Sequence, residues 1–485
     1  MFLFFPTVLL LAIAIFQTAT VRQGHIWGDD FALYIGHARN IVEHRPYAET
    51  RFLWDSASQV SPKMYPPVFP LLLAPVYRFF GLNLIAMKIE QVLFFVVALA
   101  IIYRLWRREL QMPYRLALIA IIGFSPHFWA AKDNVLSDIP FFLFFFTSAV
   151  LVEFAPRESE KWWCWAVLVG LALYFSTGTR TAGIALIAGL VLYDLIKYRT
   201  LTRLTAVALA VWTSLLMLQT RIVGSGFASY QGQFRLNLQS IKVNLVAYPR
   251  AVAGFWVAST HGWFSFLVLA VVGILGLTGF LVRRTRGITS VEAFLIPYAA
   301  LVLLWPFSPG IRLAFPFIPW LAFLVLCGLS ALTERFAPRY STIAVCVLLL
   351  TLSVAFLRAY QNTDFGKIRQ STGLPEFNEL CGEVRKQTRQ QDVLVYYRAR
   401  ALALYTDRSV TSYDLHAADE ELWQYSQRVH ASYLITSNLP EVDRGRSEKV
   451  VAKRSSALEL AYQNANFKLY RILPTAETVA SYARR

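Results

Sequence analysis

Residues 2–34 read FLFFPTVLLLAIAIFQTATVRQGHIWGDDFALY, an apolar run followed by a polar loop with two adjacent aspartates. The run from Phe2 to Thr20 is long enough to cross a bilayer as a helix, which takes about 20 apolar residues. Asp29 and Asp30 then stand at a membrane face, where two neighbouring carboxylates are costly to desolvate and repel each other. Their placement indicates general-base chemistry or cation binding at the membrane surface.

The composition is that of a polytopic membrane protein. Of the 485 residues, 56% are hydrophobic and 16% are charged, whereas an ordinary soluble domain has about 25% charged residues. The first apolar run lacks a basic leader and an Ala-x-Ala-like cleavage site, so we expect a retained helix and no signal peptide. The net charge of +17 fits the excess of basic residues in cytoplasmic loops, and we expect no nucleic-acid partner.

The apolar runs predict a bundle of about eleven transmembrane helices. Alternate connecting loops are basic, notably 104–115, 197–203 and 283–286, and the positive-inside rule therefore assigns these loops to the cytoplasm. An odd number of crossings then sends the acidic pair and the C-terminus to the outer face. The expected spans are 2–20, 84–103, 114–130, 138–154, 162–177, 181–196, 204–221, 262–282, 291–306, 313–332 and 341–357.

Two outer loops within this membrane domain, residues 1–358, are long. The first, 21–83, contains several prolines between 61 and 70 that oppose helix formation, and an apolar stretch, 68–80, that is suited to the membrane interface and too short to span. The second, 222–261, mixes polar and aromatic residues and predicts a mobile loop with an interfacial helix.

Residues 359–485 form a tail of different composition. Short buried strands are expected at 392–397, 432–437 and 466–472, with a polar helix at 416–430 between them. This alternation predicts a small soluble α/β domain outside the membrane. No glycine-rich phosphate loop precedes its helices, so we expect a lid or packing role more than nucleotide chemistry.

The predicted outer face gathers further carboxylates. Tyr34 lies one helical turn beyond Asp30 and can point the same way, while either aspartate of the pair can act as a helix N-cap. Asp138 begins the fourth predicted span, where capping and a functional role are equally supported. Asp133 lies in the preceding turn, and we expect it to be a solvated loop residue.

Cations also occur at this face, against the charge bias of the loops. Arg180 interrupts an apolar hairpin, Arg312 begins a late helix, and Lys63 lies in the first outer loop. Snorkelling to lipid headgroups accounts for a single such residue, but three cations beside three carboxylates favour a site for an anionic substrate. A lipid-linked phosphosugar fits, because cations stabilise its leaving phosphate while a carboxylate deprotonates the attacking hydroxyl.

The order of these motifs resembles that of the GT-C membrane glycosyltransferases that use polyprenyl-phosphate sugars. These include protein O-mannosyltransferases, lipid A aminoarabinose transferases and lipopolysaccharide-core transferases of the RgtA/B/C/D-like type. The resemblance covers about residues 1–330. The quoted motifs are Asp29-Asp30-Phe31-Ala32-Leu33-Tyr34, Tyr65-Pro66-Pro67-Val68-Phe69-Pro70, Ser137-Asp138-Ile139-Pro140, Thr179-Arg180 and Arg312-Leu313-Ala314-Phe315-Pro316-Phe317-Ile318-Pro319.

The resemblance implies the roles of individual residues. Asp29 matches the catalytic base, with Asp30 and Asp138 as further catalytic residues. It implies substrate-binding roles for Tyr34, Lys63, Tyr65, Arg180 and Arg312. The chain departs from the family in two places, because the second acidic residue is Asp where Glu is common, and Tyr65 stands where a basic residue often precedes Pro-Pro.

We therefore expect an inverting glycosyltransferase in a bacterial inner membrane. It would move one sugar from a polyprenyl-phosphate donor to a hydroxyl of a glycan, lipid or protein acceptor. No cofactor or metal is required by this scheme, although an acidic pair can also bind a divalent cation. The alternative is a flippase or transporter of lipid-linked sugars, which would place ionisable residues at mid-membrane depth.

Overall fold

The computed structural model describes most of the chain. The described residues are 4–26, 28–54, 61–223, 237–257, 262–306, 310–413, 418–438 and 448–473. They form two compact units, each built from segments that are distant in sequence. The first contains residues 1–21, 66–69 and 85–365, and the second contains 22–65, 70–84 and 366–485.

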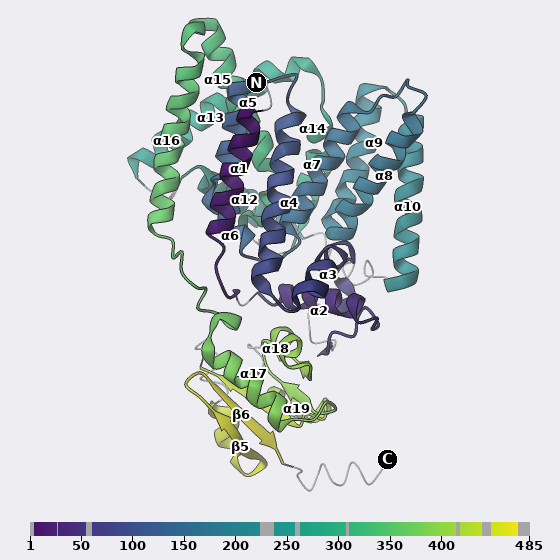
Figure 1. Cartoon of the computed structure of the whole chain (residues 1–485), viewed down its shortest axis with the longest axis vertical. Coiled ribbons are helices and arrows are strands. Elements are labelled where there is room, and N and C mark those ends of the chain that lie inside the picture. Colours follow the sequence, from purple (N-terminus) through teal and green to yellow (C-terminus); the bar gives the residue numbers. More distant parts are fainter. Residues whose placement is uncertain are drawn as a thin grey trace. The chain divides into compact units, whose positions relative to one another are not determined.

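The first unit is a bundle of helices that run alongside one another (Figure 1). Its helices are α1 (Phe4–Ala19), α4 (Leu84–Leu105), α5 (Met112–Gly123), α6 (Pro126–Lys132), α7 (Asp138–Phe154), α8 (Trp162–Thr179), α9 (Ala185–Lys197), α10 (Arg203–Val223), α12 (Leu238–Trp256), α13 (Trp263–Arg283), α14 (Ser290–Leu304), α15 (Phe317–Phe336) and α16 (Ser341–Gln361). Short 3-10 turns, η2 (Thr181–Ile184), η3 (Arg284–Arg286), η4 (Gly310–Ala314) and η5 (Pro338–Tyr340), connect some of them.

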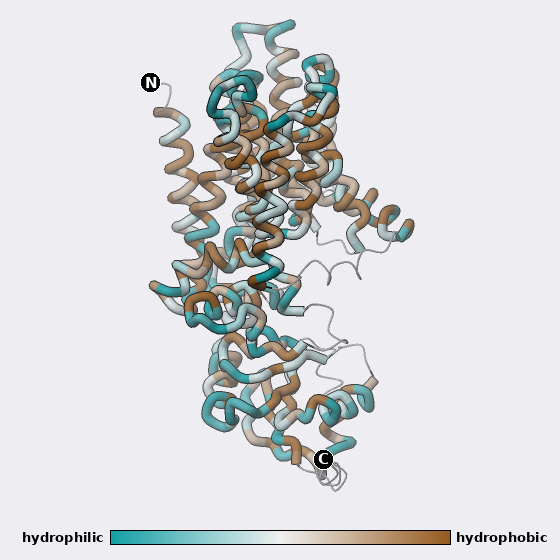
Figure 2. The backbone as a smooth tube through the Cα atoms, turned by 90° about the vertical axis from the view of Figure 1, so that its right-hand side faces the viewer, coloured by the Kyte–Doolittle hydropathy of each residue, from teal (hydrophilic) through white to brown (hydrophobic). Residues whose placement is uncertain are grey.

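The helices of this bundle are largely apolar along their length (Figure 2). Among the described residues, six helices are long and apolar enough to cross a membrane: α4, α8, α10, α13 with η3, α15, and α16 with η5. Each of the predicted spans overlaps a helix, but α1, α5 and α14 are shorter apolar helices of 10–17 residues. Six of the described helices therefore meet the length expected of a span, and the predicted number of eleven remains a prediction.

One predicted span is wrong as a single helix. Residues 114–130 were expected to be continuous, but α5 ends at Gly123 and α6 starts at Pro126. Pro126 cannot donate a backbone hydrogen bond, and Ser125 caps the new helix by accepting a hydrogen bond from the His127 backbone N–H at 3.2 Å. The break follows from local chemistry that the hydrophobicity of the segment conceals.

Two glycines allow a close helix–helix contact in the bundle. A Cβ atom on Gly279 of α13 would lie 1.9 Å from the Leu324 carbonyl oxygen of α15. A Cβ atom on Gly328 would lie 2.0 Å from the Leu275 carbonyl oxygen in return. Only a residue without a side chain permits this approach, which is typical of membrane helices that pack through small residues.

The second unit contains a six-stranded mixed sheet in the order β1-β3-β2-β4-β6-β5. The strands are β1 (Phe52–Leu53), β2 (Val393–Val395), β3 (Ser409–Thr411), β4 (Tyr433–Ser437), β5 (Leu458–Gln463) and β6 (Phe467–Ile472). Strands β1 to β4 pair in parallel, and β5 and β6 are antiparallel to their neighbours. Three of these strands, β2, β4 and β6, lie within the stretches that the sequence predicts.

The helices of this unit are α2 (Asp30–Val42), α3 (Val68–Phe80, whose first two residues belong to the first unit), α17 (Pro375–Gln387), α18 (Ala399–Thr406) and α19 (Asp419–Arg428). The 3-10 turns are η1 (Pro62–Met64), η6 (Ser371–Gly373) and η7 (Ser455–Ala457). Helix α19 lies within the predicted polar helix at 416–430.

The first outer loop is part of the same folded unit as the tail. Strand β1 of the loop pairs in parallel with β3 of the tail, with Phe52 opposite Val410. Asp407 lies 2.9 Å from the guanidinium of Arg39 on α2, and 3.6 Å from those of Arg45 and Arg51. The linear division of the chain at residue 358 therefore does not describe how its compact units form, because backbone pairing and ion pairs join the loop to the tail.

Candidate active site

The acidic pair stands at the start of α2. Asp30 is the first residue of the helix, where its charge complements the helix dipole, and Asp29 occupies the N-cap position. The Asp29 side chain makes no capping hydrogen bond. The capping role that is available to an aspartate in this position is therefore not used by Asp29, so its carboxylate is available for other chemistry.

Asp30 is held by two partners. Its Oδ1 accepts a hydrogen bond from the Tyr65 hydroxyl at 2.6 Å and another from an Arg400 guanidinium nitrogen at 3.1 Å. The same Arg400 nitrogen donates to the Tyr65 hydroxyl oxygen at 3.2 Å, which closes a triangle. Hydrogen bonds with a charged partner are the stronger kind, and this network fixes one carboxylate of the pair.

Asp29 is in a different environment. Its Oδ1 is buried and has no hydrogen-bond partner among the described residues. The pKa of Asp29 is raised to about 7. Burial is the largest cause, the nearby Arg398 and Arg400 guanidiniums oppose it, and the Asp30 charge adds to it. A carboxyl with this pKa exchanges a proton near neutral pH, as a general base requires.

Two other predicted residues of the first outer loop lie in this unit. Tyr34 is buried on α2, and its ring packs edge-on against that of Tyr65 with centroids 4.9 Å apart. Tyr65 is also buried, and burial beside Asp30 raises the pKa of its hydroxyl well above the usual value. Lys63 lies in η1 with an exposed side chain. The structure thus brings Asp30, Tyr34 and Tyr65 together, and no contact of Lys63 with them is present.

The remaining predicted residues meet in the first unit. Asp138, at the start of α7, is buried, and its Oδ1 accepts a hydrogen bond from Arg180. Its Oδ2 accepts two from Arg312, at 3.0 and 2.7 Å. Arg180 follows the end of α8 in an extended conformation, and Arg312 lies in η4. One carboxylate thus orients two guanidiniums, whose side chains remain 18% and 37% exposed.

The expectation for Asp133 is wrong. It is fully buried, with Oδ2 3.1 Å from the Lys132 ammonium and Oδ1 3.9 Å from that of Lys88. The Lys132 ammonium also donates to the Thr20 carbonyl oxygen at the end of α1, at 2.9 Å. The turn that reads as polar in the sequence is therefore a buried ion cluster. The sequence did not indicate this, because the partners at the end of α1 and on α4 are distant in the chain.

Two functional candidates were missed in the sequence. Arg398 is the N-cap residue of α18 and Arg400 lies in its first turn, directly after strand β2. The signal was present as Tyr396-Tyr397-Arg398-Ala399-Arg400, two cations and two aromatics at the carboxyl end of a parallel strand. Such strand ends are where α/β sheets usually place functional groups.

Metal binding finds no ready ligand set in the part of the chain that the structure describes. No group of three or more histidine, cysteine or acidic side chains gathers there. Asp30 already accepts hydrogen bonds from Tyr65 and Arg400. Asp30 therefore already has hydrogen-bond partners from the chain itself.

The unusual pKa of Asp29 predicts a pH-dependent effect on stability. Because the folded-state pKa is raised, folding favours the protonated form, and stability falls as pH rises from about 4 to about 7. Asp29→Asn removes this loss. We expect the variant to be more stable than the wild type by ~1–3 kcal/mol at pH 8 and equally stable at pH 4.

Thermal unfolding of the full chain in detergent at several pH values measures this difference. Glu49→Gln, which replaces an exposed carboxylate of the same unit, is the control and should follow the wild type at every pH. A constant difference between wild type and Asp29→Asn across the pH range would show that the Asp29 carboxyl is not perturbed by burial.

Comparisons with known proteins connect this geometry to a family. Residues 64–223 match the family model described as dolichyl-phosphate-mannose-protein mannosyltransferase. No curated protein matches the chain. Among solved structures, ArnT from Cupriavidus metallidurans bound to undecaprenyl phosphate has a TM-score of 0.63 at 14% identity, covering 96% of this chain and 97% of that one.

Two further structures share the fold at low identity. The oligosaccharyltransferase AglB from Archaeoglobus fulgidus, in complex with an inhibitory peptide and a dolichol-phosphate, has a TM-score of 0.57 at 11% identity and covers 89% of this chain and 69% of that one. The arabinofuranosyltransferase AftD from Mycobacteria has a TM-score of 0.52 at 13% identity, with 97% and 41% covered. The resemblance predicted from the motifs is confirmed: this chain is an integral membrane protein with the fold of the GT-C glycosyltransferases.

Proposed function

We propose that this chain is an inverting membrane glycosyltransferase that moves one sugar from a polyprenyl-phosphate donor to a hydroxyl of a glycan, lipid or protein acceptor. The observation that carries the proposal is Asp29: a buried carboxylate oxygen without a hydrogen-bond partner among the described residues, and a pKa of about 7, in a chain with the GT-C fold. The acceptor oxygen bonds to the anomeric carbon as the bond from that carbon to the phosphate oxygen breaks. Asp29 takes the acceptor's proton, and the phosphate leaves with the electron pair as an anion.

Asp30 supports this role without sharing it. Its Oδ1 is engaged by Tyr65 and Arg400, so of the two carboxylates it is Asp29 that has a free buried oxygen. A proton on Asp29 also relieves repulsion between the two neighbouring charges. In this proposal, the negative charge of Asp30 contributes to the electrostatic environment of Asp29. Tyr65 positions Asp30, and Tyr34 packs against the Tyr65 ring.

Arg180 and Arg312 are proposed to hold the donor phosphate. Asp138 accepts hydrogen bonds from both guanidiniums and keeps them in place, and both arginine side chains are partly exposed. Guanidiniums match the oxygens of a phosphate anion in geometry and charge. Because both Asp138 oxygens accept hydrogen bonds from these arginines, the proposed role of Asp138 is to orient them. The side chain of Lys63 is exposed, and we propose that it contacts the donor from the protein surface.

We propose that the site faces outward, at a bacterial inner membrane. The basic loops of the bundle assign the opposite face to the cytoplasm, and eleven crossings would place the C-terminus on the same side as Asp29. The contact between Arg400 of the tail and Asp30 of the loop supports this arrangement, since two residues in contact outside the bundle share one side of the membrane. The tail is then an extracytoplasmic α/β domain.

The base assignment predicts a specific pH profile of activity. Transfer from a panel of labelled polyprenyl-phosphate sugars should rise with pH and level off above about 7, because Asp29 must be unprotonated to accept the acceptor's proton. Asp29→Asn should lower kcat at least ~100-fold at every pH. Glu49→Gln, an exposed carboxylate in the same unit, should keep full activity.

Two outcomes would contradict the assignment. Full activity in a folded Asp29→Asn protein would exclude Asp29 as the base. Movement of intact donor across a vesicle bilayer with no cleavage of the sugar–phosphate bond would instead identify a flippase.

The effect of Arg400 on the pKa of Asp29 predicts a shift of this pH profile. Arg400 lowers the pKa of Asp29, so Arg400→Met should move the midpoint of the profile to higher pH and lower activity about tenfold at pH 7. Arg400→Lys keeps a charge and should leave the midpoint closer to that of the wild type. Arg369→Gln, an exposed arginine elsewhere in the tail, is the matched control. A uniform loss at all pH values, with an unmoved midpoint, would reduce Arg400 to a packing residue.

The donor-site assignment predicts a selective change in KM. Arg180→Gln or Arg312→Gln should raise the KM for the polyprenyl-phosphate sugar about tenfold and leave the KM for the acceptor unchanged, because each removes a donor to the phosphate. Arg250→Gln, an exposed arginine on α12, should change neither constant. An unchanged donor KM with a lower kcat would place both arginines outside the donor site.

A further inference from the structure

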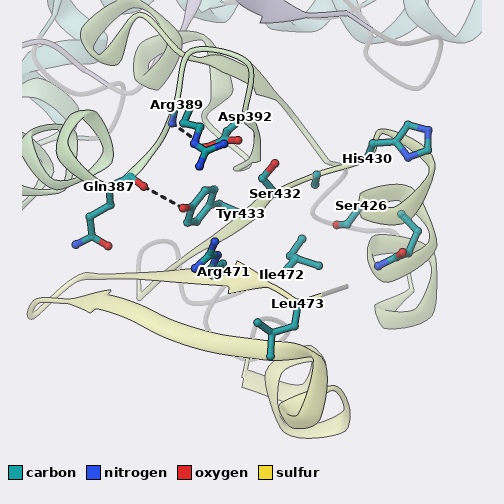
Figure 3. A pocket seen from close by; sticks show the side chains of 12 residues that line it. Gln387, Arg389, Asp392, Ser426, His430, Ser432, Tyr433, Arg471, Ile472 and Leu473 are labelled. Atoms are coloured by element: carbon teal, nitrogen blue, oxygen red, sulfur yellow. Dashed lines mark hydrogen bonds between the residues drawn. The ribbon is translucent and has the colours of Figure 1, made fainter. Parts of the chain in front are cut away.

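A polar hollow in the second unit is separate in sequence and composition from the residues assigned above. It has a volume of about 430 Å³ and lies beside the amino ends of β2 and β4 and the carboxyl end of β6. Its lining is mostly polar and includes Gln427. Ser432 and Tyr433 also line it (Figure 3). The reaction proposed above uses none of these residues.

Two arginines that line this hollow have no role in the reaction proposed above. Arg389 and Arg471 both line it, and neither guanidinium has an ion-pair or hydrogen-bond partner among the residues that the structure describes. The one carboxylate in the lining, Asp392, accepts a hydrogen bond from the backbone N–H of Arg389 at 2.7 Å and so fixes the turn that carries this arginine. Two cations and one locally engaged carboxylate therefore line the hollow, with Glu459 opposite Arg471 on β5 outside the lining.

The backbone holds the two arginines in defined positions. Arg471 stands directly opposite Tyr433 in the antiparallel pairing of β4 and β6, so their side chains are neighbours on one face of the sheet. The Tyr433 hydroxyl donates to the Gln387 carbonyl oxygen at 3.0 Å, which ties the ring to the segment before β2. In the view of Figure 3, Tyr433 lies between Arg389 and Arg471. The backbone of both arginines is thus fixed, by a strand for Arg471 and by a closed turn for Arg389.

We propose that this hollow binds an anionic sugar residue, one that carries a carboxylate or a phosphate. Arg389 and Arg471 would bind the anionic group, since guanidiniums match planar carboxylate and phosphate oxygens. The Ser432 hydroxyl and the Gln427 amide offer neutral hydrogen-bond partners to sugar hydroxyls. The volume suits a ligand of one or two sugar rings and exceeds what an isolated inorganic anion fills.

Binding to the full chain in detergent tests the proposal by calorimetry. The probes are glucuronate, glucose 6-phosphate, glucose and inorganic phosphate. We expect the wild type to bind at least one charged sugar about tenfold more tightly than glucose or inorganic phosphate. The double variant Arg389→Gln/Arg471→Gln should weaken this binding at least ~10-fold, while Arg369→Gln, which replaces an exposed arginine away from the hollow, leaves it unchanged.

Each other outcome overturns the proposal. Equal affinity for inorganic phosphate would identify a plain anion site, and equal affinity for glucose would remove the role of the arginines. Wild-type affinity in the double variant, or no binding of any probe, would exclude the hollow as a saccharide site. Both arginines are exposed, so their replacement should leave the thermal midpoint unchanged. The measurement needs no sugar transfer, so this site and the transferase proposal succeed or fail separately.

Discussion

The ion pair between Arg400 and Asp30 is the contact on which the candidate site depends. It joins α18 of the tail to the first residue of α2, and the Tyr65 hydroxyl completes it with bonds to both partners. The pairing of β1 with β3 and the ion pair of Asp407 with Arg39 bring the same two segments together. The acidic pair therefore acquires its electrostatic environment only when the loop and the tail have folded as one unit.

The three predicted catalytic aspartates show how environment separates residues of one type. Asp138 lies between two guanidiniums, which hold it as an anion that orients its partners. Asp30 shares one guanidinium with a tyrosine. Asp29 has arginines near enough to lower its pKa, but burial outweighs them and raises the pKa to about 7. Asp29, whose buried Oδ1 has no hydrogen-bond partner among the described residues, is thus the one suited to take up and release a proton.

The sequence was sufficient for those features that depend on local composition. Long apolar runs such as the one that forms α4 indicate membrane helices by their length and composition. The order of motifs around Asp29, Asp138 and Arg312 indicated the fold. Features that depend on distant partners were not predictable. Arg400 is 370 residues from Asp30 in the chain, and the residues around Arg400 in the sequence do not indicate an acidic partner. Asp133 was expected in solvent because its lysine partner on α4 lies far away in sequence.

In the proposed reaction, the two residue groups would contact two different substrates. Around Asp29, two carboxylates and the guanidiniums of Arg398 and Arg400 cancel formally, so a neutral hydroxyl can approach without meeting a net charge. Around Asp138, two guanidiniums share one carboxylate, and in the proposed reaction these guanidiniums bind the anionic phosphate. A transferase needs both conditions at once, because the acceptor must lose a proton while the donor loses an anion.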